Sequence, residues 1–405
     1  MKKFRLPKDW KLEKLKNVST IILSNVDKKS SLAEIPVSLC NYTDVYGHNF
    51  IRSNQDFMQA TASMDEIKKF SLQKYDLIIT KDSEEPDDIG VPAVVIEDLD
   101  NVLCGYHLAI IRPNQNILDS IFLSNYFSSN TINHQLYKLS NGVTRFGLSQ
   151  DSIQNITVPV LPIKEQKKIA GIFYSYDINI EKLSTLISQK LLLKKALMQQ
   201  LLTGKKRFKE FRKSKWVTVH LGDIFTERIE RNENSNHFEL LSITNERGIV
   251  KRGEVDKIDT SSEDKSNYKI IRRGDIGYNT MRMWQGVSAV SEIDGIISPA
   301  YTVVKPKDNI AAQFMGYLFK YQPMIYTFKR YSQGMVDDTL NCKFDSFSKI
   351  KITVPSLKEE QEKIASFFNL IDIEIQIIQK KLELLKLQKK GLMQKLLTGK
   401  IRVKV

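Results

Sequence analysis

The chain contains an internal repeat, which constrains its architecture more than any other feature of the sequence. Residues 163–208 align without a gap on residues 358–403 at a constant offset of 195, and 21 of the 46 aligned pairs are identical. A weaker match places Trp10 beside Trp216, each near the start of one half of the chain. The stretches between these points hardly resemble one another. The sequence therefore predicts a duplicated scaffold that carries two diverged domains.

Each copy of the repeat has the apolar spacing of a long helix. Apolar residues recur at alternating steps of three and four, which forms one stripe along a helix and is typical of a coiled coil. Prolines precede each copy, and Gly204 and Gly399 follow, as expected at helix ends. The stripe residues that we expect to form a spacer are Ile180, Leu183, Ile187, Leu197, Ile375, Ile378, Leu382 and Leu392.

Two matching stripes favour pairing of the two helices with each other, although a single amphipathic stripe often packs on its own domain. Lys194 and Lys389 occupy equivalent places in the two stripes. A parallel, in-register pair would set these like charges side by side, whereas an antiparallel pair separates them. Each helix of about 40 residues would be roughly 60 Å long, and a parallel pair would force the intervening domain to run back along that length. The sequence therefore predicts an antiparallel coiled coil with pseudo-twofold duplication.

The segments outside the repeat have the pattern of mixed α/β domains. Short apolar runs bounded by turn residues predict buried strands at 75–80, 93–96, 108–111, 275–278 and 301–304. Apolar spacing predicts helices at 117–126 and 311–328. We therefore expect an α+β chain with α/β domains at 1–157 and 209–353 and helical spacer segments at 158–208 and 354–405.

The charge balance favours a polyanionic partner. Lys and Arg number 61 against 47 Asp and Glu, a formal net charge of +14, which raises the local concentration of polyanions around the chain. A basic protein without a nucleic-acid role has a similar balance, so charge alone does not decide. The N-terminal residues lack the apolar region of a signal peptide, and no apolar run is long enough to span a bilayer.

The three cysteines, Cys40, Cys104 and Cys342, are odd in number and widely scattered. This pattern argues against a disulfide framework or a zinc site and is typical of small core residues in a reducing compartment. We therefore expect a cytoplasmic protein that holds no metal.

The whole chain resembles the specificity subunits of Type I restriction-modification systems. The phrases that carry the resemblance are 162–166 (Pro-Ile-Lys-Glu-Gln) with Ile169-Ala170, 273–276 (Arg-Gly-Asp-Ile), and the Leu-Leu-Thr-Gly-Lys end of each repeat. Two departures weaken transfer of individual residues: Leu357 stands where the phrase has proline, and residues 74–77 read Lys-Tyr-Asp-Leu. Each phrase is short and would be weak evidence alone. The match is strong because the phrases occur in the family's order and are duplicated.

The resemblance implies a non-catalytic reader of double-stranded DNA. Each of its two target-recognition domains would contact one part of a split target, and the helices would set the gap between the parts. Because the two domains differ, the target would be asymmetric. The family also implies two modification subunits that bind the helical region and methylate adenine with S-adenosylmethionine, and two restriction subunits in the full complex. The specificity subunit itself would need no cofactor.

Candidate DNA contacts are polar and aromatic residues on loops next to the predicted strands, since base edges and phosphates need donors and acceptors. Any one of them, taken alone, has the alternative of being an ordinary solvated surface group, and the aromatic residues have that of core packing. In the first domain the candidates are Lys81, Ser83, Tyr106, His107, Thr144 and Arg145. In the second domain they are Asn279, Arg282, Trp284, Gln285, Tyr301 and Lys343.

Motifs for catalysis do not emerge from the sequence. Residues 298–301 (Ser-Pro-Ala-Tyr) lack the first amide or acid and the second proline of an adenine-methyltransferase loop. Gly204-Lys205 and Gly399-Lys400 lack the upstream glycine and the following hydroxyl of a phosphate-binding loop. Two alternatives to a DNA reader remain open at this point: a coiled-coil scaffold whose inserted domains bind proteins, and the reader of a fused restriction enzyme.

Overall fold

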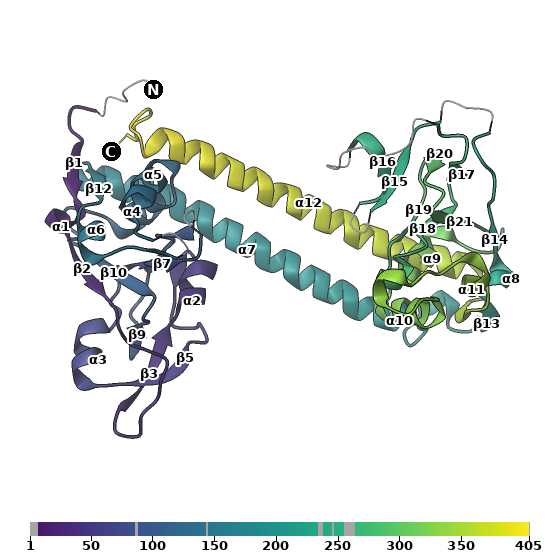
Figure 1. Ribbon diagram of the computed structural model, residues 1–405, viewed down its shortest axis with the longest axis horizontal. Helices are drawn as coiled ribbons and strands as arrows, with labels where there is room; N and C mark the ends of the chain where they lie inside the picture. The colour runs from purple at the N-terminus through teal and green to yellow at the C-terminus, as the bar shows by residue number, and fades with distance from the viewer. Residues whose placement is uncertain are drawn as a thin grey trace. The chain divides into compact units, whose positions relative to one another are not determined.

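The computed structural model describes residues 7–85, 88–142, 145–233, 238–244, 247–254 and 264–404. The chain forms two compact units, one comprising residues up to Thr185 and from Gln379 onward, the other comprising residues 186–378. Each unit contains one mixed α/β domain and part of each of two long helices, α7 (Ile163–Leu201) and α12 (Lys358–Leu396) (Figure 1). The two units are described separately.

The first unit is built on a five-stranded sheet, in which every neighbouring pair is antiparallel except β4 with β8. The strand order is β2 (Ser19–Leu23), β10 (Leu108–Pro113), β6 (Leu77–Thr80), β8 (Pro92–Val95) and β4 (Phe50–Ile51). A smaller sheet contains β5 (Met58–Ala62), β3 (Ile35–Cys40) and β9 (Val102–Cys104). Two further pairs join β1 (Lys11–Lys14) to β12 (Thr157–Val160) and β7 (Asp82–Ser83) to β11 (Phe146–Gly147). The helices of the domain are α1 (Leu15–Val18), α2 (Tyr42–Gly47), α3 (Met64–Phe70), α4 (Ser120–Phe127), α5 (Asn130–Leu139) and α6 (Gln150–Gln154).

The second unit has a four-stranded antiparallel sheet in the order β14 (Phe225–Glu227), β21 (Tyr301–Pro306), β18 (Ile276–Asn279) and β19 (Ser288–Val290). Three strand pairs accompany it: β13 (Trp216–His220) with β22 (Lys351–Pro355), β15 (Leu241–Thr244) with β16 (Gly248–Lys251), and β17 (Lys269–Ile271) with β20 (Gly295–Ile297). Its α-helices are α8 (Leu221–Ile224), α9 (Ala312–Phe319), α10 (Gln322–Tyr331) and α11 (Phe344–Ser348).

The predicted buried strands are confirmed, and their continuous apolar sequence has a physical cause. In β6, Leu77 and Ile79 pack into one core, with α4 and α7, whereas Ile78 packs into a second core on the other face of the sheet. A strand that is buried on both faces reads as an unbroken apolar run rather than an alternating one. The prediction of a single helix at 311–328 is wrong. The helix is interrupted at Lys320–Tyr321, and a second helix, α10, begins there with Pro323 in its first turn.

The same turn enters the central strand in both domains. The backbone N–H of Gln73 donates to the Asp76 carboxylate (2.8 Å), and Arg272 donates to Asp275 in the same way (2.8 Å). Each turn contains a left-handed residue one position before the aspartate, Gly274 in the second domain (φ 89°) but Tyr75 in the first (φ 73°). The departure at residues 74–77 therefore changes the residue type and keeps the backbone conformation.

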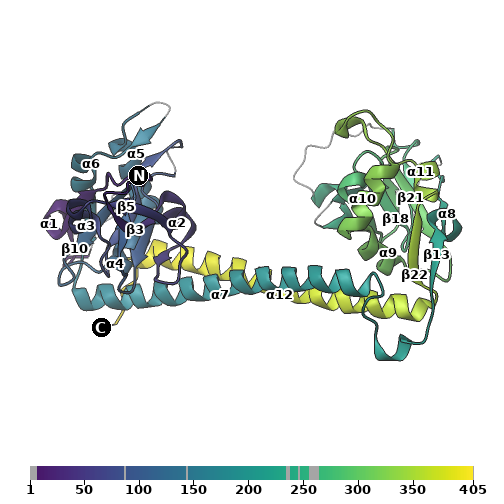
Figure 2. The ribbon, with the colours of Figure 1, turned by 90° about the horizontal axis from the view of Figure 1, so that it is seen from below.

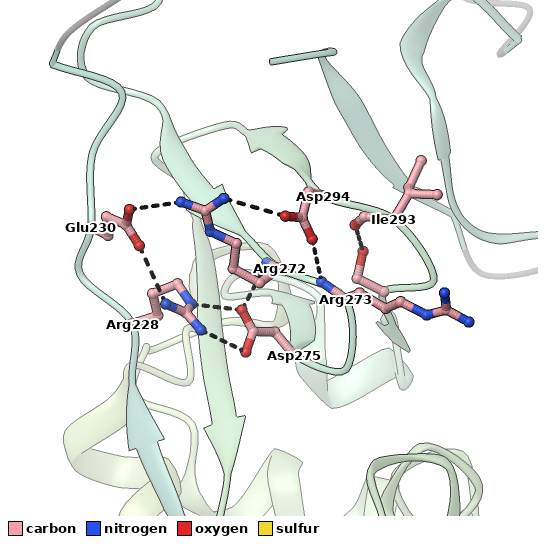
Figure 3. A network of polar contacts seen from close by, with 8 residues as sticks. Arg228, Glu230, Arg272, Arg273, Asp275, Ile293 and Asp294 are labelled. Atoms are coloured by element: carbon pink, nitrogen blue, oxygen red, sulfur yellow. Dashed lines mark hydrogen bonds and ion pairs between the residues drawn. The ribbon is translucent and has the colours of Figure 1, made fainter. Parts of the chain in front are cut away.

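Each turn aspartate is buried and bound by an arginine, but the two arginines come from different strands. Arg112 of β10 forms two hydrogen bonds with Asp76, at 2.7 and 2.8 Å. In the second unit Arg228, just after β14, binds Asp275 at 2.6 and 3.1 Å (Figure 3). A buried carboxylate needs such a partner because desolvation of an unpaired charge is costly. The diverged domains meet the same requirement with different residues.

Within each unit α7 and α12 lie side by side and run in opposite directions, as predicted (Figure 1 and Figure 2). Asp177 and Lys389 pair in the first unit (2.6 Å), and their counterparts Asp372 and Lys194 pair in the second (2.5 Å). Each stripe lysine therefore faces an aspartate of the other helix. Within the described residues no helix, these two included, has the length and apolar character needed to cross a membrane.

The Glu-Gln phrase at the start of each long helix makes two different connections. Glu165 is almost fully buried and accepts two hydrogen bonds from Arg402, both 2.6 Å; Glu360 accepts two from Arg207, at 2.8 and 2.6 Å. These arginines follow the end of the opposite helix. The neighbouring glutamines hold each helix to its own α/β domain, since Gln166 binds Asp119 N, Ile117 O and Leu161 O, and Gln361 binds the equivalent backbone groups Ala311 N, Asn309 O and Pro355 O.

The two tryptophans aligned by sequence cover the ends of the long helices. Gly204 and Gly399 have positive φ (70° and 71°), as helix-ending glycines often do. A Cβ on Gly204 would lie 3.1 Å from the Trp216 ring, and one on Gly399 would lie 3.6 Å from the Trp10 ring. Each ring also lies within 6 Å of the arginine that binds the buried glutamate. The Leu-Leu-Thr-Gly-Lys ends are therefore parts of a packed junction.

The turn that leads into β18, which contains Gly274, allows a test of backbone strain. Gly274→Ala is expected to lower the free energy of unfolding by about 1 kcal/mol or more, because a left-handed residue with a Cβ is strained and no neighbour lies within 4 Å of that Cβ. Gly253→Ala is the control, because its Cβ also meets nothing and its φ is not positive. Denaturant unfolding of both variants measures the difference; equal stability of the two would contradict the strain.

A second test concerns the start of α9. Asp119 caps α4 by accepting from Ile121 N (3.0 Å) and Phe122 N (2.9 Å), but the equivalent residue of the second domain is Ala311, without a capping side chain. Ala311→Asp is expected to raise the free energy of unfolding by about 1 kcal/mol. Ala311→Asn should give a similar gain in thermal unfolding, since its amide oxygen also caps. If only Ala311→Asp stabilised the protein, the gain would come from its charge. If neither variant stabilised it, a side-chain cap at this position would not matter.

Candidate nucleic-acid interface

Three chain segments meet where the central strand of the first domain ends. Residue 81 follows β6, the turn 105–107 precedes β10, and Leu148 follows β11. The backbone N–H of Lys81 donates to His107 O (3.0 Å), and Leu148 N donates to Lys81 O (2.8 Å). Antiparallel pairing of β6 with β10 places the end of one strand beside the start of the other. The sheet therefore brings together candidates that are far apart in the sequence.

Side chains at this edge form a contiguous polar and aromatic cluster. The Lys81 ammonium lies 4.7 Å from the centroid of the Tyr106 ring and donates to Ser24 O (3.2 Å). Tyr106 is half exposed and meets the His107 ring edge-on at 4.9 Å. His107 Nδ1 lies 3.1 Å from the Asp82 carboxylate. The cluster thus presents a cation, a phenol and an imidazole to solvent.

The remaining candidates of the first domain have different placements. Arg145 is exposed beside β11, near the cluster. Ser83 is only 9% exposed, and its hydroxyl accepts from Glu85 N (3.1 Å), so its position suits holding the loop rather than contacting a ligand. Thr144 lies outside the described residues.

Sequence reasoning missed the helix that borders this cluster. Tyr42 and Tyr46 of α2 stack at 5.7 Å, Tyr42 contacts the Ser83 hydroxyl, and the Tyr46 hydroxyl donates to Asp88 (3.3 Å). The negative charge of Asp88 raises the pKa of Tyr46, so the phenol remains a hydrogen-bond donor. The signal that could have found the pair is two tyrosines four residues apart, which lie on one face of a helix.

The corresponding edge of the second domain is the loop between β18 and β19. Asn279 N donates to Val287 O (3.0 Å), and Gly286 closes the short helical turn 283–285 with a φ of 78°. Met283 is fully buried beneath this turn, whereas Arg282 and Gln285 are exposed. The loop is therefore anchored from below, and its polar side chains face solvent.

Two further segments complete this edge. Lys329 of α10 places its ammonium 5.0 Å from the Trp284 ring, whose Nε1 donates to Met281 O (3.0 Å). Cys342 N donates to Thr280 O (2.9 Å), which brings the exposed Lys343 to the same loop. Sequence reasoning missed Lys329, because candidates were sought on loops next to the predicted strands, whereas Lys329 lies on a helix.

Tyr301 is less exposed to solvent than the loop candidates Arg282 and Gln285. It pairs with Asn279 in the ladder between β21 and β18 and is partly packed against the core formed around Leu241 and Val303. The structure therefore gathers Asn279, Arg282, Trp284, Gln285 and Lys343 at one edge and places Tyr301 at its base.

The two clusters occupy equivalent places, after β6 and after β18, and consist mainly of cations, amides and aromatic rings. Such groups can bind phosphates and hydrogen-bond to the edges of bases.

The polar network at the opposite end of β18 has a different character. There Arg272 binds both Glu230 (3.0 Å) and Asp294 (3.2 Å), so most charges are paired within the protein (Figure 3). Among the described residues no group of three or more His, Cys, Asp and Glu side chains is placed to hold a metal ion.

Two curated proteins of Methanocaldococcus jannaschii are similar to this chain. The specificity subunit of the type I restriction enzyme MjaX is 26% identical over 98% of this chain and 95% of its own length. The specificity subunit of the type I restriction enzyme MjaVIII is 27% identical over 73% of each chain.

Solved structures with low sequence identity share the fold. The S subunit of a Type-I restriction-modification system from M. genitalium superimposes with a TM-score of 0.61 at 15% identity, covering 98% of this chain and 97% of that one. A chain from a structural study of type I R-M complex assembly and conformational transition has a TM-score of 0.50 at 15% identity, covering 98% of this chain and all of that one.

The family model for the Type I restriction modification DNA specificity domain matches this chain twice, over residues 7–191 and 213–387. The two matches fall on the two α/β domains and the greater part of α7 and α12, the elements on which the sequence resemblance rests. The chain belongs to the Type I restriction-modification DNA specificity family and is a DNA-sequence-recognition subunit.

Proposed function

We propose that this chain reads a split, asymmetric DNA target, one part with each α/β domain, and itself catalyses no reaction. The observation that carries the proposal is the pair of clusters after β6 and β18. They occupy equivalent strand ends but present different groups: Lys81, Tyr106 and His107 in one, Arg282, Gln285 and Lys343 in the other. Readers with different donors and acceptors would prefer different bases.

We further propose that residues 1–157 and 209–353 are the two readers and that residues 158–208 and 354–405 are the spacer between them. The stripe residues of α7 and α12 support this division. Ile375 and Leu382 are buried, and the other predicted stripe positions are half-buried, so the stripe is used within each unit. The lengths of both helices, 39 residues each, would then set the gap between the two parts of the target.

The outer surface of the long helices suggests where partner subunits bind. In the second unit α7 exposes Leu191, Leu192 and Leu193, and α12 exposes Leu370, Ile373 and Ile377. Large apolar side chains that are exposed on two neighbouring helices are candidates for protein–protein contacts. We propose that two modification subunits bind the helices and methylate adenine with S-adenosylmethionine, and that two restriction subunits join them. Because its ligand is DNA, we also propose that the complex acts in the cytoplasm.

The test of the proposed function is to co-express the chain with its modification subunit and to map methylated adenines by long-read sequencing. The expected result is one bipartite motif with two different parts and a fixed gap. Methylation at a continuous or palindromic motif would refute the split, asymmetric reading. If no methylation occurs, DNA binding over a salt series decides: affinity that is independent of salt and sequence would favour a protein-binding scaffold.

The two clusters should act independently. Lys81→Ala is expected to weaken binding or relax base preference in one half of the target only, and Arg282→Ala in the other half only, by about 1–3 kcal/mol for a lost base contact. A lost phosphate contact would instead lower affinity for all sequences and reduce the salt dependence. Lys16→Ala and Lys305→Ala are matched controls, because both lysines are exposed and lie toward the other end of the sheets. Competition binding with targets mutated in one half measures the effect, and unchanged preference in both halves would contradict these assignments.

The spacer can be tested by a matched insertion of seven residues after Thr185 in α7 and after Lys380 in α12. These positions differ by the repeat offset, and a heptad preserves the phase of the stripe. Each heptad adds about 10 Å of helix, so the preferred gap is expected to lengthen, by at most about three base pairs. Methylome mapping reads the gap directly. An unchanged gap would show that the helices are not the ruler, and a two-residue insertion, which breaks the phase, serves as the control.

A further inference from the structure

The first unit contains a direct polar connection between the sheet and α7. The segment Asn49–Arg52 includes β4, the edge strand of the five-stranded sheet. Asn49 Nδ2 donates to Asp177 Oδ1 (3.0 Å), and the Phe50 ring meets the Tyr174 ring edge-on at 5.1 Å. Arg52 binds both oxygens of Glu181, at 2.8 and 2.9 Å. Residues 174, 177 and 181 are three and four apart, so the three contacts lie along one face of the helix.

This connection reaches the second long helix as well. The same Asp177 oxygen that accepts from Asn49 also accepts from Lys389 of α12 (2.6 Å). Asp177 is only 5% exposed, and burial raises its pKa, which Lys389 and Asn49 oppose by favouring the charged form. Asn49 therefore supplies a hydrogen bond to a carboxylate that is already largely removed from water. Loss of the Asn49 side chain would remove one hydrogen bond from the buried Asp177 carboxylate, and an unsatisfied buried carboxylate is costly.

The second unit holds its domain on the helices differently. Its counterpart of Asp177, Asp372, accepts from the Tyr317 hydroxyl of α9 (2.9 Å) in addition to Lys194. The position equivalent to Glu181 is Gln376, which cannot form an ion pair. In the described part of this unit the main sheet ends at β19, without a counterpart of β4. The connection through residues 49–52 is thus a property of the first unit.

The geometry of this connection suits orientation more than stability. The core that includes Ile169 and Phe173 of α7 already holds the sheet against the helix through apolar contacts, which are not directional. A two-point contact between a guanidinium and a carboxylate constrains direction as well as distance. Glu181 is 46% exposed, and ion pairs as exposed as this contribute little to folding stability. Removing the pair should therefore loosen the angle between domain and helix while the unit stays folded.

We propose that Asn49, Phe50 and Arg52 form a positioning latch that fixes the angle of the first recognition domain on α7, so that the subunit accepts only a narrow range of gaps between the two parts of its target. The inference rests on the proposed bipartite reading. The latch residues lie on β4 or directly beside it, away from the cluster after β6, and act through the placement of the domain. They are positioning residues, and their loss should leave the bases preferred in each half unchanged.

The test compares methylation by the complex with its modification subunits on three targets: the native gap and gaps one base pair longer and shorter. In Arg52→Glu a carboxylate faces Glu181, and the preference for the native gap is expected to fall by up to about fivefold. The double exchange Arg52→Glu with Glu181→Arg restores the pair and should restore the preference. Lys182→Glu is the matched control, since it also replaces a cation by an anion, at an exposed position of α7 beside Glu181.

The readouts distinguish a latch from a general structural role. Arg52→Glu should change the ratio of rates among the three gaps, while half-site preference and thermal unfolding stay close to those of the unaltered chain. An unchanged ratio in Arg52→Glu, or a changed ratio that the double exchange does not restore, would overturn the latch. If the unaltered chain itself methylates all three gaps equally, the fixed-gap reading fails instead, so failure of the latch and failure of the proposed function give different results.

Discussion

The paired charges between α7 and α12 set the direction in which the two helices pair, and each unit is built on that pair of helices. Asp177 with Lys389 and Asp372 with Lys194 are the same two positions of the repeat, used reciprocally. In a parallel, in-register pair each lysine would face a lysine and each aspartate an aspartate. The net stability of such partly buried pairs is modest because desolvation offsets attraction, but a mismatched pair would be strongly unfavourable. The ion pairs therefore select the antiparallel arrangement, and apolar stripe residues supply the packing.

The Glu-Gln phrase shows how one short motif serves two connections. The glutamine binds backbone groups of its own domain, whereas the glutamate binds an arginine that follows the opposite helix. Adjacent residues on a helix point about 100° apart, so one dipeptide can face two neighbours at once. The repeat preserves this phrase because both junctions need it. The loops after β6 and β18 carry no such requirement and are free to differ.

The two domains differ in many side chains, but they share the turn that leads into the central strand. The turn before the central strand survives in both domains, with Tyr75 in the left-handed conformation that Gly274 adopts at lower cost. Tyr75 is held there by its backbone, since its N–H donates to Val95 O and its carbonyl accepts from the Ser120 hydroxyl. The carboxylate that this turn positions kept an arginine partner, although the arginine moved to a neighbouring strand. Both turns therefore contain a buried aspartate with an arginine partner, although the residue before the aspartate and the position of the arginine differ.

The sequence by itself determined the duplication, the two long helices, their antiparallel pairing and the central strands, because each follows from periodicity or from charges at equivalent positions. It also placed Lys81 and Arg282 just past those strands. Only the tertiary structure decided that Ser83 turns inward, that Tyr42, Tyr46 and Lys329 border the clusters, and that Asn49 and Arg52 reach α7. These outcomes depend on contacts between segments far apart in the chain, such as Arg52 with Glu181, 129 positions away. Local spacing carries no information about such pairs, because they are set by how sheet and helix pack together.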